Sequence, residues 1–214
     1  MAGHQARAGG TRYIFTGPGL ASYRRRPLTS NVRPHKKMSS PLYILQSERL
    51  GFRRYRASDG ELLRPVFADP HASQFYPAMG EQEGVDRWIN WNLKNYDEFG
   101  FGLWALELLG SGVFVGDAGI THQNVGDQRI LEIGWHIHPD FRARGYATEA
   151  GRECLKFGFS TLHATTLSSI VDPGNFASMK VASRVHAQQS HYEGKSGSML
   201  LYYTHAHMSD RADP

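Results

Sequence analysis

A basic loop between a predicted strand and a predicted helix carries the clearest chemical signal in this sequence. The loop lies within residues 131–150 and contains Arg142, Arg144 and Gly145. The first amides of a helix lack partners within the helix and carry partial positive charge, so together they bind anions. Glycine lets the backbone approach a ligand closely, and the arginines add charge. We therefore predict a pyrophosphate site here; an ordinary strand-to-helix connection with exposed arginines is the alternative.

Five segments resemble motifs of one protein family, in the same order along the chain. Residues 142–147 fit neither a Walker loop nor a dinucleotide fingerprint, but they are similar to the (Q/R)xxGx(G/A) acetyl-CoA motif of the GNAT superfamily of N-acetyltransferases. The other segments resemble its ribosomal-protein N-terminal (alanine) acetyltransferase branch, at residues 47–59, 115–120, 132–135 and 175–181. The resemblance covers residues 42–204. It implies an enzyme that moves an acetyl group from acetyl-CoA to an amine.

The resemblance also implies where acetyl-CoA binds as a co-substrate. In the family, the strand before the loop splays away from its neighbour, which leaves backbone amides free to pair with the pantetheine arm. The loop amides hold the pyrophosphate. Asn175 is expected to hydrogen-bond the pantetheine; the alternative is that Asn175 is only a turn residue that follows Pro173 and Gly174. The implied cofactor-binding residues are Trp135, Ile137, Arg142, Ala143, Arg144, Gly145, Tyr146, Ala147, Asn175 and Ser178.

Transfer to an amine requires removal of a proton from the ammonium group. Alternation along the strand puts Glu132 and His136 on one face. We predict Glu132 as the base, because an apolar strand should bury the carboxyl and raise its pKa; an exposed or ion-paired glutamate is the alternative. His136 is a relay, a competing base or a plain sheet-surface histidine. The resemblance suggests Tyr192 as the acid that protonates the thiolate, with a core or sheet tyrosine as the alternative.

Cysteine and histidine spacings argue against covalent and metal chemistry. The reaction needs no enzyme nucleophile, so Cys154, on the apolar face of its predicted helix, is expected in the core. The pairs His136-x-His138 and His205-x-His207 each place two histidines on one side of a strand. Neither pair has a third or fourth ligand within a recognisable pattern, so we expect no metal site.

The acceptor side of the site is less clearly marked. Trp88 falls in the apolar stripe of a predicted helix and is expected in the core, whereas Trp91 lies off that stripe and, with Tyr76, is a candidate for the acceptor pocket. At the end of the last helix the family usually has Lys-Leu-Gly. This chain has Arg184–Ala187 there, without the glycine that stops such a helix. The departure affects the segment that leads to Tyr192.

Hydrophobic periodicity and turn residues predict the elements that must position these residues. Their order is β-α-α-β-β-β-α-β-α-β-β. The fold class is therefore α/β, and the resemblance implies a GNAT fold: a mixed, mostly antiparallel sheet with a splayed pair of strands and helices on both faces. The strands are predicted at residues 43–55, 103–109, 113–120, 130–138 and 167–171, around Tyr192, and at 199–204. The helices are predicted from Ser58–Asp59 to Asp69–Pro70, around 85–96, and at 147–162 and 177–185.

Charge divides the chain into unequal parts. Residues 1–40 hold six Arg and two Lys with no Asp or Glu, whereas the remainder carries 16 basic and 20 acidic residues. The high pI therefore belongs to the tail, which weakens any claim that the folded part binds nucleic acid. We predict a disordered basic tail at 1–40, an N-acetyltransferase domain at 41–208 and a C-terminal tail at 209–214. The first tail is a solvated leader, an overcalled start before Met38, or a transit peptide.

Composition narrows the class of protein further. No stretch approaches the roughly 18 continuous apolar residues of a membrane span. A single cysteine excludes an intramolecular disulfide and suits a reducing compartment. We expect a cytoplasmic enzyme whose partners are acetyl-CoA and an amine, either a protein N-terminus or a small molecule, with no membrane partner and a homodimer as one possible assembly. The alternatives are a non-catalytic acyl-CoA-binding protein and a ribosome- or nucleic-acid-associated protein acting through the basic tail.

Overall fold

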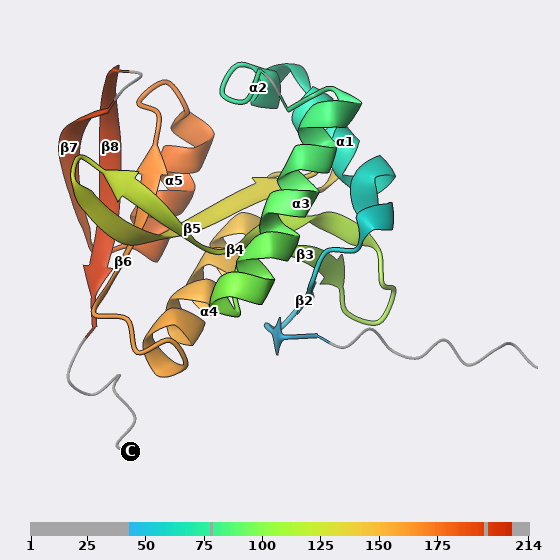
Figure 1. Cartoon of the computed structure of the whole chain (residues 1–214), viewed down its shortest axis with the longest axis horizontal. Coiled ribbons are helices and arrows are strands. Elements are labelled where there is room, and N and C mark those ends of the chain that lie inside the picture. The colour runs from blue at the N-terminus through green and yellow to red at the C-terminus, as the bar shows by residue number, and fades with distance from the viewer. Residues whose placement is uncertain (1–42, 78, 195–196, 207–214) are drawn as a thin grey trace, which may run out of the picture. The chain divides into compact units, whose positions relative to one another are not determined.

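The computed structural model describes residues 43–77, 79–194 and 197–206, so both predicted tails lie outside the described residues. The strands form one sheet (Figure 1) in the order β1-β2-β3-β4-β5-β6-β8-β7. They are Leu45–Gln46 (β1), Leu50–Arg53 (β2), Leu103–Leu108 (β3), Phe114–Val125 (β4), Gln128–Ile137 (β5), Thr166–Val171 (β6), Gln188–Gly194 (β7) and Gly197–His205 (β8). The α-helices are Gly60–Ala68 (α1), Pro70–Ser73 (α2), Gln82–Phe99 (α3), Tyr146–Ser160 (α4) and Phe176–Val185 (α5).

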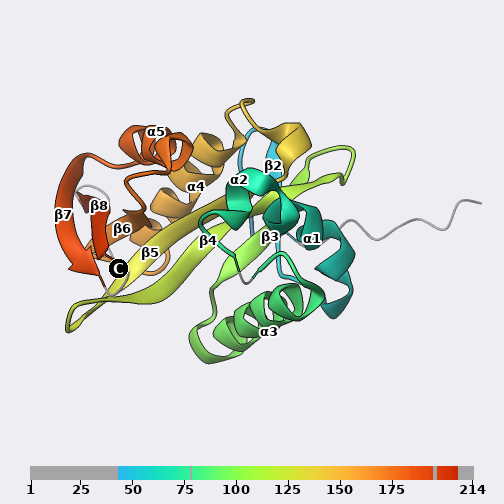
Figure 2. The same ribbon diagram turned by 90° about the horizontal axis from the view of Figure 1, so that it is seen from above.

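The sheet is mixed and mostly antiparallel, as predicted. Neighbouring strands run antiparallel except for β5 and β6, which are parallel. Helices α1 and α3 lie on one side of the central strands, and α4 and α5 lie on the other (Figure 2). Ala150 and Cys154 of α4 are fully buried, and burial raises the pKa of the Cys154 thiol. The expectation that this cysteine belongs to the core is confirmed.

The prediction of one continuous strand at residues 43–55 is wrong. This segment is a hairpin, because β1 pairs antiparallel with β2. The connection turns where the Ser47 amide donates to the Leu50 carbonyl oxygen at 2.9 Å. Glu149 of α4 holds this turn, since its carboxylate accepts hydrogen bonds from the Ser47 hydroxyl at 2.7 Å and the Arg49 amide at 2.8 Å.

The start of the first helix is where the sequence predicts it, but its capping is different. A 3-10 turn, Ala57–Asp59 (η1), precedes α1, and the Asp59 side chain makes no capping bond to α1. Its carboxylate instead pairs with the buried Arg53 guanidinium at 2.6 Å. The predicted end at Asp69–Pro70 is followed by α2, because Asp69 caps that helix by accepting from the His71 and Ala72 amides.

Helix α5 ends without a glycine, and a polar network occupies the place of the usual helix stop. His186, the residue after the helix, has an extended backbone with φ −104° and ψ 153°. Its Nε2 lies 2.9 Å from the Ser169 hydroxyl and its Nδ1 lies 3.3 Å from the Thr204 hydroxyl. Burial lowers the pKa of His186 to about 4. A neutral imidazole therefore joins the end of α5 to β6 and β8.

Candidate active site

The sheet opens between the two parallel strands. β5 and β6 are paired at one position, Glu132 with Ser168, whereas the pairing of β5 with β4 continues to Ile137. Where the strands separate, the Ser169 hydroxyl donates to the Ile133 carbonyl oxygen at 2.6 Å. Beyond Ile133, one edge of β5 therefore has no neighbouring strand within the described residues. The predicted splayed pair is confirmed.

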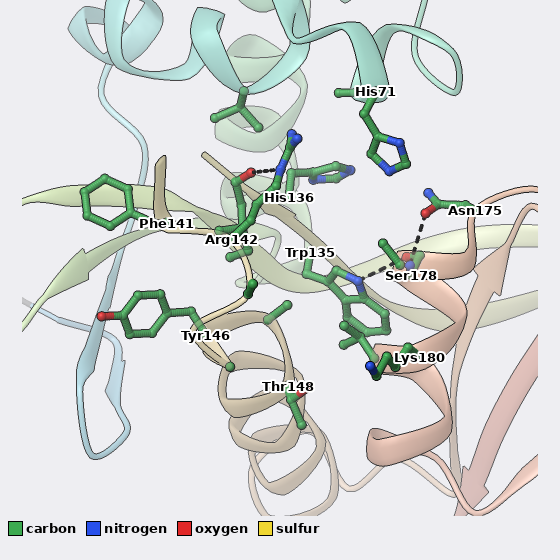
Figure 3. Close-up of a pocket in the computed structure, with 18 of the residues that line it drawn as sticks. His71, Trp135, His136, Phe141, Arg142, Tyr146, Thr148, Asn175, Ser178 and Lys180 are labelled. Carbon is green, nitrogen blue, oxygen red and sulfur yellow. Dashed lines mark hydrogen bonds between the residues drawn. The ribbon is translucent and has the colours of Figure 1, made fainter. Parts of the chain in front are cut away.

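A cavity of about 480 Å³ lies at this opening, between α2 and α5 and against the start of α4 (Figure 3). Its lining includes Arg142, Lys180 and Arg184 and no Asp or Glu from the described residues. Of the residues that the family resemblance implies for the cofactor, only Arg144 is not part of the lining. The others that line it are Trp135, Ile137, Arg142, Ala143, Gly145, Tyr146, Ala147, Asn175 and Ser178.

The loop that leads into α4 has the backbone shape of an anion site. Ala143 and Gly145 both have left-handed backbones, with φ of 60° and 84°. Gly145 precedes the first helical residue, Tyr146, and no side chain caps the helix. The first amides of α4 thus lack side-chain partners at the edge of the cavity. Unpaired amides at the start of a helix point outward along its axis, which favours a phosphate group.

The two loop arginines shape the loop more than they charge the cavity. Arg142 Nη1 lies 2.7 Å from the Asp69 carboxylate, and its Nε donates to the Ile137 carbonyl oxygen at 3.1 Å. Arg144 donates to the Asp140 carbonyl oxygen at 2.9 Å. The expected role of both guanidiniums as phosphate charges stays a prediction, since each also bonds a protein group. Lys180 and Arg184 supply charge to the lining. Sequence reasoning missed them, although their i,i+4 spacing places them on one face of α5.

Glu149 lies in the first turn of α4 and is hydrogen-bonded to the turn between β1 and β2. Burial alone would raise the pKa of Glu149, but hydrogen bonds from Ser47 and Arg49 lower it overall. The Arg49 guanidinium also lies 4.5 Å from the centre of the Tyr146 ring and donates to the Arg144 carbonyl oxygen. Arg49 thus holds the loop in place. Because Arg49 and Arg144 are 95 residues apart in the sequence, a local sequence pattern does not reveal this role.

A second cavity, of about 520 Å³, adjoins the first and has the opposite charge. Among the residues that the structure describes, its lining includes Glu132 and Asp172 and no Lys or Arg. Aromatic side chains form much of the rest, among them Tyr76, Trp88 and Trp91. Tyr76 and Trp91, the two candidates for the acceptor pocket, both line this cavity, and Trp88 lines it as well as packing on the core. The two cavities share Phe75, Tyr76, Trp135, His136, Asn175 and Ser178.

Glu132 has the electrostatic character of a base that works near neutrality. Burial raises its pKa to about 7, although the Ile170 amide and the nearby His136 act in the opposite direction. The Ile170 amide donates to Glu132 Oε1 at 3.2 Å. The carboxyl lies on the wall of the second cavity, so a group in that cavity can reach it.

His136 is held by a buried carboxylate that sequence reasoning missed. His136 Nδ1 lies 2.7 Å from Oδ1 of Asp117, whose side chain is fully buried. The other oxygen, Oδ2, accepts from the Tyr55 hydroxyl at 2.7 Å and from Trp88 Nε1 at 3.0 Å. The signal in the sequence was Gly116, because a Cβ there would lie 2.1 Å from the His136 carbonyl oxygen. Glycine next to the aspartate lets the two strands approach.

The remaining predicted site residues have mixed positions. Asn175 caps α5, since its side-chain oxygen accepts from the Ser178 amide at 3.0 Å. The Ser178 hydroxyl accepts from Trp135 Nε1 at 3.2 Å, and Figure 3 shows both contacts at the cavity wall. Tyr192 lies on β7 and lines neither cavity. Its pKa is raised by burial and by the charge of Glu132.

The described part of the chain has neither a metal-binding cluster nor a membrane-spanning helix. There, no group of three or more His, Cys, Asp or Glu side chains is arranged to hold a metal ion. His207, one of the paired histidines in the sequence, lies outside the described residues. No helix in residues 43–77, 79–194 or 197–206 is both long and apolar enough to cross a membrane.

Comparison with known proteins agrees with this geometry. Residues 49–188 match the model of the acetyltransferase (GNAT) domain family. The uncharacterized protein YkkB of Bacillus subtilis (strain 168) is 34% identical over 120 residues, which are 56% of this chain and 70% of that protein. The crystal structure of an acetyltransferase from Agrobacterium tumefaciens str. C58 is 28% identical, with a TM-score of 0.64, over 76% of this chain and 94% of that one.

Structures of more distant proteins share the fold. RimL, a ribosomal L7/L12 alpha-N-protein acetyltransferase determined in complex with coenzyme A, has a TM-score of 0.60 at 14% identity, over 76% of this chain and 97% of that one. The region that matches the family model contains the opened strands β5 and β6, the anion loop and the residues that line the first cavity. This chain therefore belongs to the GNAT acetyltransferase family, and it is an acyltransferase.

Proposed function

We propose that this protein transfers an acetyl group from acetyl-CoA to a primary amine, by direct attack within a ternary complex. One observation carries the proposal: a positively lined cavity and a negatively lined cavity meet at the opening between β5 and β6. The first suits the anionic cofactor, and the second suits a cationic amine. His136 lies where the two meet, and Glu132 lies on the wall of the second cavity.

The positive cavity supports an extended mode of acetyl-CoA binding. The pyrophosphate would lie on the amides that start α4, with Lys180 and Arg184 nearby. The pantetheine would pair with the free edge of β5 along residues 135–137. Because Asn175 uses its side-chain oxygen to cap α5, its Nδ2 is the group that would bond the pantetheine. RimL, a protein of the same fold, has been determined in complex with coenzyme A, which supports coenzyme A as the ligand class.

The negative cavity supports Glu132 as the group that takes the first proton from the acceptor. A base with a pKa of about 7 is ionised in part at neutral pH and still accepts protons well. The acceptor is a protein N-terminus, as the names of ribosomal-protein acetyltransferases of this fold suggest, or a small amine. We place the reaction in the cytoplasm, which the single cysteine suits; cell fractionation checks this.

Binding is tested with a pair of matched glycine variants. Gly145 and Gly110 both have left-handed backbones, with φ of 84° and 83°, so Gly145→Glu and Gly110→Glu carry the same backbone strain. Only Gly145 lies at the cofactor cavity. Acetyl-CoA should raise the melting temperature of the wild type and of Gly110→Glu equally. Loss of the shift in Gly145→Glu alone supports the proposal, and an equal shift in all three proteins contradicts it.

Turnover is tested by measuring release of the CoA thiol with a panel of amines and N-terminal peptides. Glu132→Gln should keep acetyl-CoA affinity and lower turnover by about 10²–10⁴ at neutral pH. The loss should shrink as pH rises, because more of the amine is then already neutral. A wild-type protein that binds acetyl-CoA but releases no CoA with any amine would refute the proposed function.

A further inference from the structure

The hydrogen bonds around Asp117 determine which nitrogen of His136 carries a proton. The indole N–H of Trp88 can only donate, so the Asp117 carboxylate acts as an acceptor there. Burial and the charge of Asp117 raise the pKa of Tyr55 well above its usual value, so the Tyr55 hydroxyl keeps its proton and donates. The free acceptor oxygen of Asp117 then faces His136 Nδ1 at 2.7 Å.

The consequence is a single tautomer of the neutral imidazole. Nδ1 must carry the proton that it shares with Asp117, and Nε2 is left as an acceptor. Aromatic rings fix the orientation of His136, with ring centres of Phe67, Tyr76 and Trp88 5.1, 5.0 and 5.2 Å away. In the part of the chain that the structure describes, no protein group bonds Nε2. That nitrogen is available to whatever occupies the cavities.

Two titratable side chains, Tyr76 and His136, line both cavities. Burial raises the pKa of Tyr76, so its hydroxyl keeps its proton, which leaves His136 as the shared group that can take a proton from the amine. His136 lines the first, positively lined cavity (the cofactor cavity) and the second, negatively lined cavity (the acceptor cavity). Its side chain is 10% exposed. Glu132 lines only the acceptor cavity, and Tyr192 lines neither. A group that must first meet the amine and then the sulfur needs this shared position. The location of His136 therefore fits a proton carrier better than the location of Tyr192 fits an acid.

We propose that His136 shuttles a proton from the attacking amine to the departing CoA thiolate, and that Asp117 is the positioning residue that keeps Nε2 ready to accept it. This inference rests on the proposed function. It extends that function by assigning the acid of the reaction. It also gives a role to the buried carboxylate of Asp117, which is far from solvent and has no part in the cofactor loop.

The proposed steps balance as follows. The acceptor ammonium gives one proton to Glu132. The neutral nitrogen attacks the thioester carbon, which forms a C–N bond and leaves negative charge on oxygen and positive charge on nitrogen. His136 Nε2 takes a second proton from that nitrogen. The intermediate then re-forms the C=O bond and breaks the C–S bond, and the imidazolium protonates the CoA thiolate. The first proton leaves Glu132 for water.

The tautomer can be measured directly in the wild-type protein. Two-bond ¹H–¹⁵N spectra of the imidazoles, with His136→Asn used for assignment, should show Nδ1 protonated and Nε2 unprotonated in the neutral ring. In Asp117→Asn, the amide oxygen must face the Trp88 donor, so the amide nitrogen faces His136 Nδ1. The proton should then move to Nε2. A wild-type ring with its proton on Nε2 overturns the proposal without any variant.

Kinetics separate the shuttle from a structural role. His136→Asn retains an N–H donor for Asp117 but has no Nε2, so it keeps that hydrogen bond and removes the carrier. His136→Asn and Asp117→Asn should each lower kcat by about 10² or more, the usual size of a general acid–base effect, with KM for acetyl-CoA little changed. Asp127→Asn, at an exposed turn position of the same hairpin, is the matched control and should leave kcat unchanged.

Tyr192→Phe distinguishes the two candidate acids. It should retain most of the turnover if His136 protonates the thiolate. A large loss in Tyr192→Phe together with full turnover in His136→Asn overturns the shuttle and assigns the acid to Tyr192. Full turnover in both His136→Asn and Asp117→Asn also overturns it. Failure of the wild type to acetylate any amine is a separate result, because it removes the proposed function itself.

Discussion

Replacing Glu132 with glutamine should change how the stability of this protein depends on pH. The folded protein raises the pKa of this carboxyl from 4.5 to about 7, mainly because the group is buried. The charged form is therefore disfavoured in the folded state relative to the unfolded chain. The stabilising contribution of the neutral carboxyl is complete below pH 4.5 and is lost as the pH rises through about 7. Glu132→Gln has no carboxyl to ionise and escapes this loss.

The magnitude follows from the two pKa values. They differ by about 2.5, and each unit corresponds to about 1.4 kcal/mol, so the wild type should lose about 3 kcal/mol that the variant keeps. The glutamine oxygen can still accept the Ile170 amide, so the substitution preserves the one direct hydrogen bond to this side chain. The free energy of unfolding of Glu132→Gln, relative to wild type, should thus rise by about 3 kcal/mol between pH 4.5 and pH 8.

Urea unfolding followed by tryptophan fluorescence at several pH values between 4.5 and 8 measures this difference. Glu83→Gln is the matched control, because the Glu83 side chain is 93% exposed. Its stability should run parallel to that of the wild type. If Glu132→Gln also runs parallel to the wild type across the range, then Glu132 has no raised pKa and the electrostatic argument for its role as a base fails.

Three further predictions follow from other groups. His186, with a pKa of about 4, should make the free energy of unfolding fall as the pH falls from 6.5 to 4, which is the opposite of the effect of Glu132. Urea unfolding of His186→Gln should therefore show the pH dependence caused by Glu132 alone. An unchanged pH profile would show that His186 is not neutral in the folded protein. The acidic residues of the acceptor cavity should repel the carboxylate of a free amino acid, so its KM should be about fivefold to tenfold higher than the KM of the corresponding amino acid amide. Asp172→Asn should reduce this difference in KM. Equal KM values for the two acceptors in the wild type would contradict the charge argument. Removal of residues 1–37 should leave the acetyl-CoA shift in melting temperature unchanged, because that sequence has no pattern that packs into a core; loss of the shift would give the segment a structural role.

The local features of this fold were readable because they depend on near neighbours in the sequence. Apolar periodicity identified α3 and α4, since one face of a helix must meet the core whichever core it meets. The anion loop was readable for the same reason, because Gly145 and the unpaired amides of the following helix are consecutive in sequence. The raised pKa of Glu132 was also predicted, because apolar neighbours along a strand are enough to bury a carboxyl.

Only the tertiary structure decided which distant groups complete the site. Asp117 meets Tyr55 across 62 residues and Trp88 across 29, and Arg142 is joined to Asp69 across 73. A short-range sequence pattern does not identify such distant partners. The sequence therefore predicted Asp117 only as one residue of a strand and Arg142 only as a positive charge of the loop. The sequence by itself determined the strand, the loop and the helix of the cofactor site. The packing of other elements on β4 and β5 decided which nitrogen of His136 faces the cavities, because the carboxylate that orients the ring is buried where those elements meet.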